Sequence, residues 1–328
     1  MIHRFSADLT IQEIAANGNE LANIMGMDMD DEGKRIYHYP DDREIHVATF
    51  MHPVLVSDNY RACQLSPAKR DTVITLLNAS KKIIEYDDVK LNFDQSKYPG
   101  LWGPSIDTLL FCKALRNVPF WNVGKIVEIG AGSGFISKYI LEKVPHSLVS
   151  YTVDINPYSK KCIEDNGIPC ASVVQDGIEF LERIPEANFD MILCNPPYIP
   201  RPGAIDDNAY EGVSLLKFLI QDAHKFLKPG GCIITNISSL SRNIIDELIK
   251  DSGIKVEVLA SMEVPLKVYN ILNNPKWIKY LKKNGLQDRP VDGYDYWSGA
   301  KTRDIGLKKI PGYDYWQTIE IVKIEKMG

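Results

Sequence analysis

The stretch Asn195-Pro196-Pro197-Tyr198 carries the side chains of this sequence that are best suited to chemistry. It follows the apolar run Phe189–Cys194, which predicts a buried strand. Two prolines cannot continue a central strand, so the chain is expected to leave the sheet at Asn195. An amide and an aromatic ring at this point suit the binding of a planar NH2 group by hydrogen bonds and stacking. The alternative is a proline turn that ends the strand, with Asn195 as its cap.

A second group of candidate residues lies between a predicted strand at 125–129 and the helix that follows it. Glycine occupies every second position of this loop, and an acidic residue precedes it: Glu128, Gly130, Gly132 and Gly134. Such glycines let the backbone approach a ligand, and the helix N-terminus points amides at it. The dinucleotide fingerprint needs a glycine where Phe135 stands, and the Gly-Lys-Ser/Thr of a phosphate-binding loop is absent. The acidic residue instead favours a cationic ligand group.

Two aspartates end the next two predicted strands, Asp154 after 148–153 and Asp176 after 170–175. At the carboxyl end of its strand, Asp154 is placed to accept hydrogen bonds from two ribose hydroxyls. Asp176 is placed to accept one from an adenine amino group. Each aspartate could instead cap only the turn that follows it. Their recurrence at successive strand ends favours a site for a ligand with an amino-acid end, a ribose and an adenine.

The elements that must position these residues alternate between strands and helices. Strands are predicted at 125–129, 148–153, 170–175, 189–194, 232–237 and 255–260, and helices at 106–115, 158–166, 178–183, 213–227 and 241–249. This alternation predicts an α/β fold, a doubly wound and mostly parallel sheet covered on both faces. Alternating apolar and polar residues at 318–324 predict a seventh, antiparallel strand at the edge of the sheet.

Residues 1–95 are expected to form an N-terminal accessory region that positions the substrate, with a helix at 66–84 and a strand within 46–56. Residues 96–328 are expected to form the catalytic domain. An insertion at 261–316, before the last strand, is our candidate for acceptor recognition. It contains a predicted helix at 275–284 and two copies of Gly-Tyr-Asp-Tyr-Trp, at 293–297 and 312–316. These aromatic residues either stack on bases or, as we favour, form hairpin corners that pack on the sheet.

Composition narrows the class of protein. With 45% hydrophobic and 25% charged residues, the 328-residue chain is typical of a soluble globular protein. It has no apolar run of about 18 residues and no apolar signal core at its start, so we expect a cytoplasmic protein without a membrane partner. Its six histidines and six cysteines lack metal-ligand spacing, so no metal is expected. The net charge of −5 argues against strong non-specific binding to a polyanion.

Together these motifs resemble the class I S-adenosylmethionine-dependent methyltransferases, which have a Rossmann-like fold. The matching segments are Val-Glu128-Ile-Gly130-Ala-Gly132-Ser-Gly134, Val-Asp154-Ile-Asn, Gln-Asp176-Gly, Asn195-Pro-Pro-Tyr198 and Leu-Lys-Pro-Gly230-Gly. The sequence N-P-P-Y after such a glycine loop marks the branch that methylates planar amino or amide nitrogens. That branch includes adenine-amino methyltransferases of DNA and RNA and the HemK-like protein-glutamine methyltransferases.

The resemblance implies a cofactor, S-adenosylmethionine, and a function, methyl transfer to an amide or exocyclic amino nitrogen of a macromolecule. The acceptor is a protein glutamine or a nucleic-acid base, and the two remain open. The residues implied for the cofactor are Glu128, Gly130, Ala131, Gly132, Gly134, Asp154, Ile155, Asp176, Gly177 and Asn195. The residues implied for catalysis are Asn195, Pro196, Pro197 and Tyr198. The Asn195 side-chain oxygen and the Pro196 carbonyl would each accept one N–H hydrogen bond, and Tyr198 would stack on the acceptor.

Two other classes of function stay open at this point. The first is a cofactor-binding scaffold subunit that has lost catalysis, which an intact Asn195–Tyr198 stretch argues against. The second is a nicotinamide-dependent oxidoreductase, which Phe135 in the glycine loop disfavours.

Overall fold

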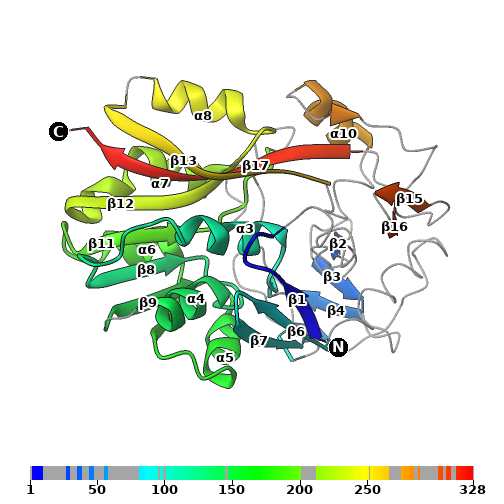
Figure 1. Cartoon of the computed structure of the whole chain (residues 1–328), viewed down its shortest axis with the longest axis horizontal. Coiled ribbons are helices and arrows are strands. Elements are labelled where there is room, and N and C mark those ends of the chain that lie inside the picture. The colour runs from blue at the N-terminus through cyan, green and yellow to red at the C-terminus, as the bar shows by residue number, and fades with distance from the viewer. Residues whose placement is uncertain are drawn as a thin grey trace. The chain divides into compact units, whose positions relative to one another are not determined.

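A computed structural model describes the parts of the chain that hold the candidate site (Figure 1). The residues that it describes are 2–9, 27–29, 35–38, 44–47, 55–57, 81–94, 97–98, 101–144, 147–200, 212–250, 252–265, 275–283, 287–288, 302–305, 308–311 and 315–327. The chain forms two compact units. One comprises Met1–Ile106 with Val264–Gln317, and the other comprises Asp107–Glu263 with Thr318–Gly328. Every candidate site residue lies in the second unit.

A mostly parallel sheet forms the centre of the second unit. Its strand order is β10-β9-β8-β11-β12-β17-β13, and the short strand β14 (Gln287–Asp288) pairs with the start of β17. The seven strands of the main path are β8 (Lys125–Ile129), β9 (Val149–Asp154), β10 (Ala171–Val174), β11 (Phe189–Cys194), β12 (Leu227–Ser238), β13 (Ile254–Pro265) and β17 (Tyr315–Lys326). The path turns back between β8 and β11, which confirms the predicted doubly wound sheet.

Helices precede or connect these strands. They are α3 (Ile106–Leu115), α4 (Phe135–Lys143), α5 (Pro157–Asp165), α6 (Gly177–Glu182), α7 (Ser214–Gln221) and α8 (Arg242–Ile249). Helices α4 and α5 follow strands that progress in one direction across the sheet, whereas α6, α7 and α8 follow strands that progress in the other. Because such crossovers are right-handed, the two sets cover opposite faces. The single helix predicted at 213–227 is interrupted, and the short 3-10 helix Ala223–Phe226 follows α7.

The central strands are buried on both faces, as their continuous apolar sequence predicts. In β11 the side chains of Phe189, Met191, Ile192, Leu193 and Cys194 are all buried. Since a central parallel strand without alternation has no solvent face, a polar residue at its end lies next to a dry interior. Asn195 occupies this position.

The prediction that the last strand lies at the edge of the sheet was wrong. Strand β17 is antiparallel to β12, as predicted, but it lies between β12 and β13. Its interior position is consistent with the burial of consecutive residues Ile321 and Val322, which point to opposite faces. Strand β13 forms the edge instead, and Val258 on it is exposed. Alternation in the sequence marks a strand but does not say which strands flank it.

In the first unit, β1 (Ile2–Phe5), β6 (Lys81–Tyr86) and β7 (Val89–Asp94) form a three-stranded sheet. The helix predicted at 66–84 is therefore wrong over its last residues, and residues 66–80 lie outside the described part of the chain. Strands β2 (Met27–Met29), β3 (Arg35–His38), β4 (Glu44–Val47) and β5 (Leu55–Ser57) form a second sheet. The strand predicted within 46–56 is thus two strands.

The insertion contains helix α10 (Pro275–Lys283), which confirms the predicted helix, and the hairpin β15 (Thr302–Ile305)–β16 (Lys308–Pro311). The first Tyr-Asp-Tyr-Trp copy lies outside the described residues. Of the second copy, Tyr315 and Trp316 begin β17. Among the helices that the structure describes, none is both long and apolar enough to cross a membrane.

Candidate active site

The register of four parallel strands aligns their carboxyl ends. Ile129 on β8 pairs with Val153 on β9 and with Cys194 on β11. Cys194 in turn pairs with Thr235 on β12. The next position on each chain therefore falls in one row across the carboxyl edge of the sheet, and this row consists of Asp154, Gly130, Asn195 and Asn236. Ligands of open α/β sheets bind at this edge, where the path turns back between β8 and β11.

The members of this row lie on the same face of the sheet as Glu128. Glu128 pairs with Leu193 on β11, and Leu193 pairs with Ile234 on β12. Because side chains alternate along a strand, the residues two positions beyond Leu193 and Ile234 share the face of Glu128. Those residues are Asn195 and Asn236.

Glu128 connects the end of β8 to the first turn of α4. Its Oε2 accepts a hydrogen bond from the backbone N of Ser137 at 2.9 Å and a second from the Ser137 hydroxyl. Burial raises the pKa of Glu128 to about 8, against the lowering effect of these hydrogen bonds, and the nearby Asp154 raises it further. The sequence did not predict Ser137, because a serine in a helix carries no local motif. This contact spans the glycine loop and fixes both of its ends.

Asp154 is held by two backbone amides. Its Oδ2 accepts from the N of Gly132 at 2.7 Å, and its Oδ1 accepts from the N of Asn156 at 2.8 Å. Burial raises the pKa of Asp154 to about 6, although both hydrogen bonds act to lower it. Each carboxylate oxygen has two lone pairs, so each retains one acceptor position. The predicted turn contact is therefore present, and it leaves capacity for two hydroxyl donors.

The glycine loop uses most of its own amides inside the protein. The N–H groups of Gly130 and Ala131 donate to the carbonyl of Val153, and that of Gly134 donates to the carbonyl of Ala131. Gly132 is held from both sides, because its carbonyl also accepts from the hydroxyl of Ser159, at 2.6 Å. These loop amides are therefore already paired within the protein. A loop without free N–H groups at these positions suits a neutral or cationic group better than a phosphate.

The glycines of the site have two different roles. Gly130 has φ +67, and a Cβ placed on it meets nothing within 4 Å. A Cβ on Gly134 would lie 2.6 Å from Cγ1 of Ile163, and one on Gly177 would lie 2.3 Å from Cγ2 of Ile129. Gly134 and Gly177 are therefore required for close packing between elements. Gly130 instead leaves open space above the end of β8, where a ligand can lie.

Asp176 caps helix α6. Its Oδ1 accepts from the N of Ile178 at 2.9 Å and from the N of Glu179 at 3.1 Å. The structure thus shows Asp176 capping the segment that follows it, as in the alternative interpretation of this residue. Both hydrogen bonds use the same oxygen, which leaves Oδ2 for another donor. Ile155, the other candidate of this region, is half-buried next to Asp154.

Asn195 differs from the acidic residues because its side-chain oxygen has no partner. In the described part of the chain, Oδ1 is shielded from solvent and accepts no hydrogen bond. Pro196 and Tyr198 beside it are buried. Leaving a buried acceptor unsatisfied costs about 1–3 kcal/mol, and native proteins tolerate this mainly where the group has a function. Asn195 therefore presents a preformed acceptor for an N–H donor.

These residues together fit a ligand that carries hydroxyl and ammonium donors. Asp154 and Glu128 supply acceptors, Gly130 supplies space, and Asn195 supplies an unoccupied acceptor one strand further along. No group of three or more potential metal ligands is present among the residues that the structure describes.

Comparisons with known proteins relate the chain to methyltransferases. The family model of the methyltransferase small domain matches residues 106–262. A relative from Methanocaldococcus jannaschii, named as a protein N5-glutamine methyltransferase, is 33% identical over 206 residues, which cover 58% of this chain and 98% of the relative. The release factor glutamine methyltransferase of Geobacter sulfurreducens is 27% identical over 42% of this chain and 54% of its own length. The crystal structure of precorrin-6y C5,15-methyltransferase from Geobacter metallireducens matches at 16% identity and a TM-score of 0.40, over 72% of this chain and 97% of that chain.

Proposed function

Since the chain belongs to the class I S-adenosylmethionine-dependent methyltransferases, within the small-domain family, we propose that it methylates the side-chain amide nitrogen of a glutamine in a protein. The observation that carries this proposal is the buried, unpartnered Oδ1 of Asn195 in one row with Asp154 and Gly130. The relative that is aligned over 98% of its length bears the name of a glutamine methyltransferase. A net charge of −5 also favours a protein acceptor over a polyanion.

The cofactor site follows from the contacts of the acidic residues. Asp154 would hold the ribose hydroxyls with the lone pairs that Gly132 and Asn156 leave unused. Glu128 would hold the ammonium group, directly or through water, while Ser137 fixes its carboxylate. Oδ2 of Asp176 would accept from the adenine amino group. When bound, S-adenosylmethionine supplies a sulfonium methyl carbon, so an N–C bond forms while the S–C bond breaks and its electron pair stays on sulfur.

The protein's part in the reaction is to orient the nitrogen. An amide nitrogen is a poor nucleophile because its lone pair is delocalised into the carbonyl. Oδ1 of Asn195 would accept one N–H of the acceptor and the carbonyl of Pro196 the other, which aims the lone pair out of the amide plane toward the methyl carbon. Both acceptors interact more strongly as positive charge develops on nitrogen, and so they favour the transition state. An amide protonated on nitrogen is strongly acidic, so the released proton passes to water without a dedicated base.

Transfer of labelled methyl groups to peptides tests this function. The substrate is a pool of blocked peptides with one central glutamine and random flanking residues, and the control is the same pool with glutamate in place of glutamine. We expect label in the glutamine pool only, with mass spectrometry placing the added methyl group on the side-chain nitrogen.

Nucleic acid is the alternative acceptor, and the same assay tests it. The same reaction is run with total RNA and with DNA, and each product is treated with nuclease or with protease. Label that nuclease removes, together with an unlabelled glutamine pool, would replace the proposed acceptor with a nucleic-acid base.

A further inference from the structure

Unsatisfied buried polar groups concentrate at the carboxyl edge of the catalytic sheet. Six described side chains have a buried nitrogen or oxygen without a hydrogen-bond partner. Four of the six lie at this edge: Gln175 and Asn195 directly follow β10 and β11, and Thr235 and Asn236 lie near the end of β12. Asn236 stands out because neither its Nδ2 nor its Oδ1 has a partner and its exposed fraction is 0%. Exchanging the two atoms of the amide would therefore still leave both a donor and an acceptor unsatisfied.

The position of Asn236 relative to the reaction follows from the register. The row across the edge runs from Asp154 on β9 through Gly130 and Asn195 to Asn236 on β12. Asp154 and Gly130, which belong to the cofactor site, lie on one side of Asn195, and Asn236 lies on the other. Neighbouring strands are about 4.8 Å apart. The atoms of an acceptor that extend away from the cofactor would therefore reach Asn236.

The fold itself gives no reason for an amide at this position. Neighbours Ile234 and Ile237 on β12 and Ile321, the cross-strand partner on β17, are all buried and apolar. Burying an amide without hydrogen bonds is costly, and an apolar side chain of similar size would avoid that cost. Residues that lower stability in this way occur mainly at functional sites.

We propose that Asn236 is a further acceptor-binding residue and that its Nδ2 donates a hydrogen bond to the carbonyl oxygen of the glutamine amide. This inference rests on the proposed function and adds a partner for the other half of the same amide. Asn195 accepts a hydrogen bond from the NH2 group of the glutamine amide, and Asn236 donates one to its C=O group. The two asparagines together therefore bind a carboxamide in one orientation. A glutamate side chain would place a carboxylate oxygen against Oδ1 of Asn195, and a simple amine would leave Asn236 unsatisfied.

The two asparagines should affect different kinetic constants. Donation to the carbonyl oxygen draws the nitrogen lone pair further into the amide, so Asn236 cannot raise the reactivity of the nitrogen. Its contribution is to binding and orientation of the acceptor, and it is no larger in the transition state than in the ground state. Such an interaction changes KM and leaves kcat nearly constant.

The experiment compares Asn236→Leu with wild-type enzyme on the glutamine peptide pool. We expect the apparent KM to rise about tenfold or more, kcat to change by less than about threefold, and the Kd for S-adenosylmethionine to stay constant. Because leucine removes an unsatisfied amide, the melting temperature should rise by about 2–4 °C. Thr235→Val is the matched control. It removes the neighbouring unsatisfied hydroxyl, which lies on the opposite face with Cys194, so its KM should equal that of wild type.

A second variant, Asn236→Ala, keeps the test decisive if leucine does not fit. An unchanged KM in a folded Asn236 variant would overturn the inference. So would a fall in melting temperature with loss of cofactor binding, or failure of both variants to fold, since each would show that the amide supports the structure. The wild-type reaction distinguishes failure of the proposed function: if wild type leaves the glutamine pool unmethylated, the acceptor class is wrong before any variant is compared.

Discussion

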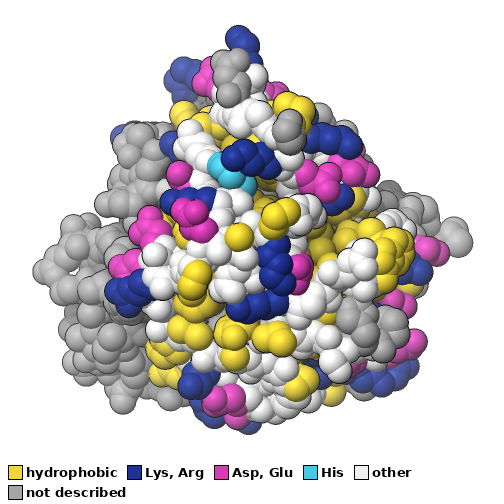
Figure 2. Space-filling model, turned by 90° about the vertical axis from the view of Figure 1, so that its left-hand side faces the viewer, with side chains coloured by type: hydrophobic (Ala, Val, Ile, Leu, Met, Phe, Trp, Pro, Cys, Tyr) yellow, Lys and Arg dark blue, Asp and Glu magenta, His cyan; other side chains and the backbone are white. Residues whose placement is uncertain are grey.

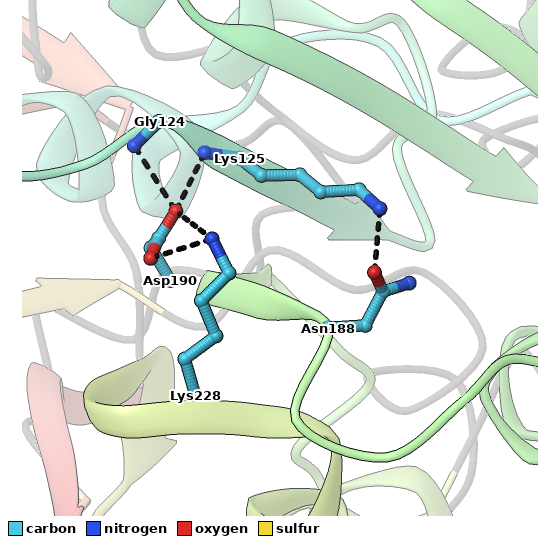
Figure 3. A network of polar contacts seen from close by, with 5 residues as sticks. All are labelled: Gly124, Lys125, Asn188, Asp190 and Lys228. Carbon is cyan, nitrogen blue, oxygen red and sulfur yellow. Dashed lines mark hydrogen bonds and ion pairs between the residues drawn. The ribbon is translucent and has the colours of Figure 1, made fainter.

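Polar side chains at the two edges of the catalytic sheet differ in whether they have hydrogen-bond partners. At the amino ends of β8, β11 and β12, Asp190 accepts four hydrogen bonds: two from Nζ of Lys228 at 2.9 Å and one each from the backbone N of Gly124 and Lys125 (Figure 3). Nζ of Lys125 donates to Oδ1 of Asn188 at 2.6 Å. Toward the carboxyl ends of β11 and β12, Oδ1 of Asn195 and both amide atoms of Asn236 are buried without a hydrogen-bond partner.

The comparison indicates that the amino edge stabilises the sheet, whereas the carboxyl edge binds ligands. The charges at the amino edge lie close to solvent and are paired across three strands, so they stabilise the order of the strands. Figure 2 shows this side of the molecule, where the C-terminus also lies. Its surface carries lysine and arginine, aspartate and glutamate, and apolar side chains next to one another. The unsatisfied amides at the carboxyl edge lower stability and are available to a ligand. Stability and function thus occupy opposite ends of the same strands.

The strongest test of this comparison replaces one asparagine at each edge. Asn195→Ala should lower kcat roughly 10²–10³-fold, because it removes the acceptor that orients the nitrogen, while the Kd for S-adenosylmethionine and the melting temperature stay close to wild type. Asn188→Ala removes the same kind of side chain at the amino edge. It should lower stability by about 1 kcal/mol and leave kcat unchanged. Calorimetry and initial rates on the glutamine peptides measure both, and full activity of Asn195→Ala would end the assignment.

Asp190→Asn tests whether the amino edge supports stability alone. Burial acts to raise the pKa of Asp190, but the hydrogen bonds from Lys228, Gly124 and Lys125 outweigh it and lower the pKa below the usual value of 3.8. A lowered pKa means that the carboxylate stabilises the fold above pH 3.8 and that this stability is lost as pH falls through the native pKa. The variant should therefore lose about 2–3 kcal/mol at neutral pH and less in acid.

Chemical denaturation at several pH values measures this difference, and the rate per folded molecule should not change. A loss of stability that is the same at acid and neutral pH would show that the charge of Asp190 is not what holds the three strands.

Glu128→Gln is the corresponding test at the carboxyl edge. Here the pKa is raised rather than lowered, so stability is lost as the pH rises. The pKa of Glu128 is raised from 4.5 to about 8, so folding favours its protonated form. This contribution is fully present below pH 4.5 and is lost as pH rises through about 8. The glutamine variant should match wild type near pH 4 and exceed its stability by about 1–3 kcal/mol at pH 9. It should also bind S-adenosylmethionine about tenfold more weakly, which corresponds to about 1.4 kcal/mol. A stability difference that does not change with pH would show that Glu128 is ionised throughout.

Much of this arrangement was predictable from local sequence. The apolar run before Asn195 ends in two prolines, so the prediction of β11 was correct to the residue. The aspartates at successive strand ends were also identified, because each directly follows an apolar run. In contrast, the strand predicted at 232–237 begins earlier, because β12 already includes Leu227 and Pro229-Gly230-Gly231. The interior place of β17 was missed too, because the order of strands in a sheet depends on long-range pairing.

The residues that sequence analysis missed lack local signals. Ser137 and Ser159 fix the glycine loop from helices α4 and α5, and both are buried, but a serine within a helix belongs to no recognisable motif. Asn236 lies in an apolar strand with no motif around it. Only the register of β12 against β11 places it next to Asn195, and only the structure shows that Oδ1 of Asn195 and both amide atoms of Asn236 are buried without a hydrogen-bond partner.

The smallest expected effects come from two glycines that differ only in the edge they occupy. Gly130 has φ +67 and Gly230 has φ +77, and a Cβ on either would meet nothing within 4 Å. Alanine at either position should therefore cost a similar amount of stability, about 1 kcal/mol, because both residues need left-handed backbone. The space at Gly130 adjoins the cofactor site, however, whereas the space at Gly230 lies at the amino edge.

Gly130→Ala should therefore weaken S-adenosylmethionine binding about tenfold, by about 1.4 kcal/mol, while Gly230→Ala leaves it unchanged at the same loss of stability. Titration calorimetry and thermal unfolding of the two variants give both quantities. Equal binding by the two variants would mean that the open space at the end of β8 is not where the cofactor lies. In that case the carboxyl edge would retain its unsatisfied asparagines but lose the feature that places a methyl donor beside them.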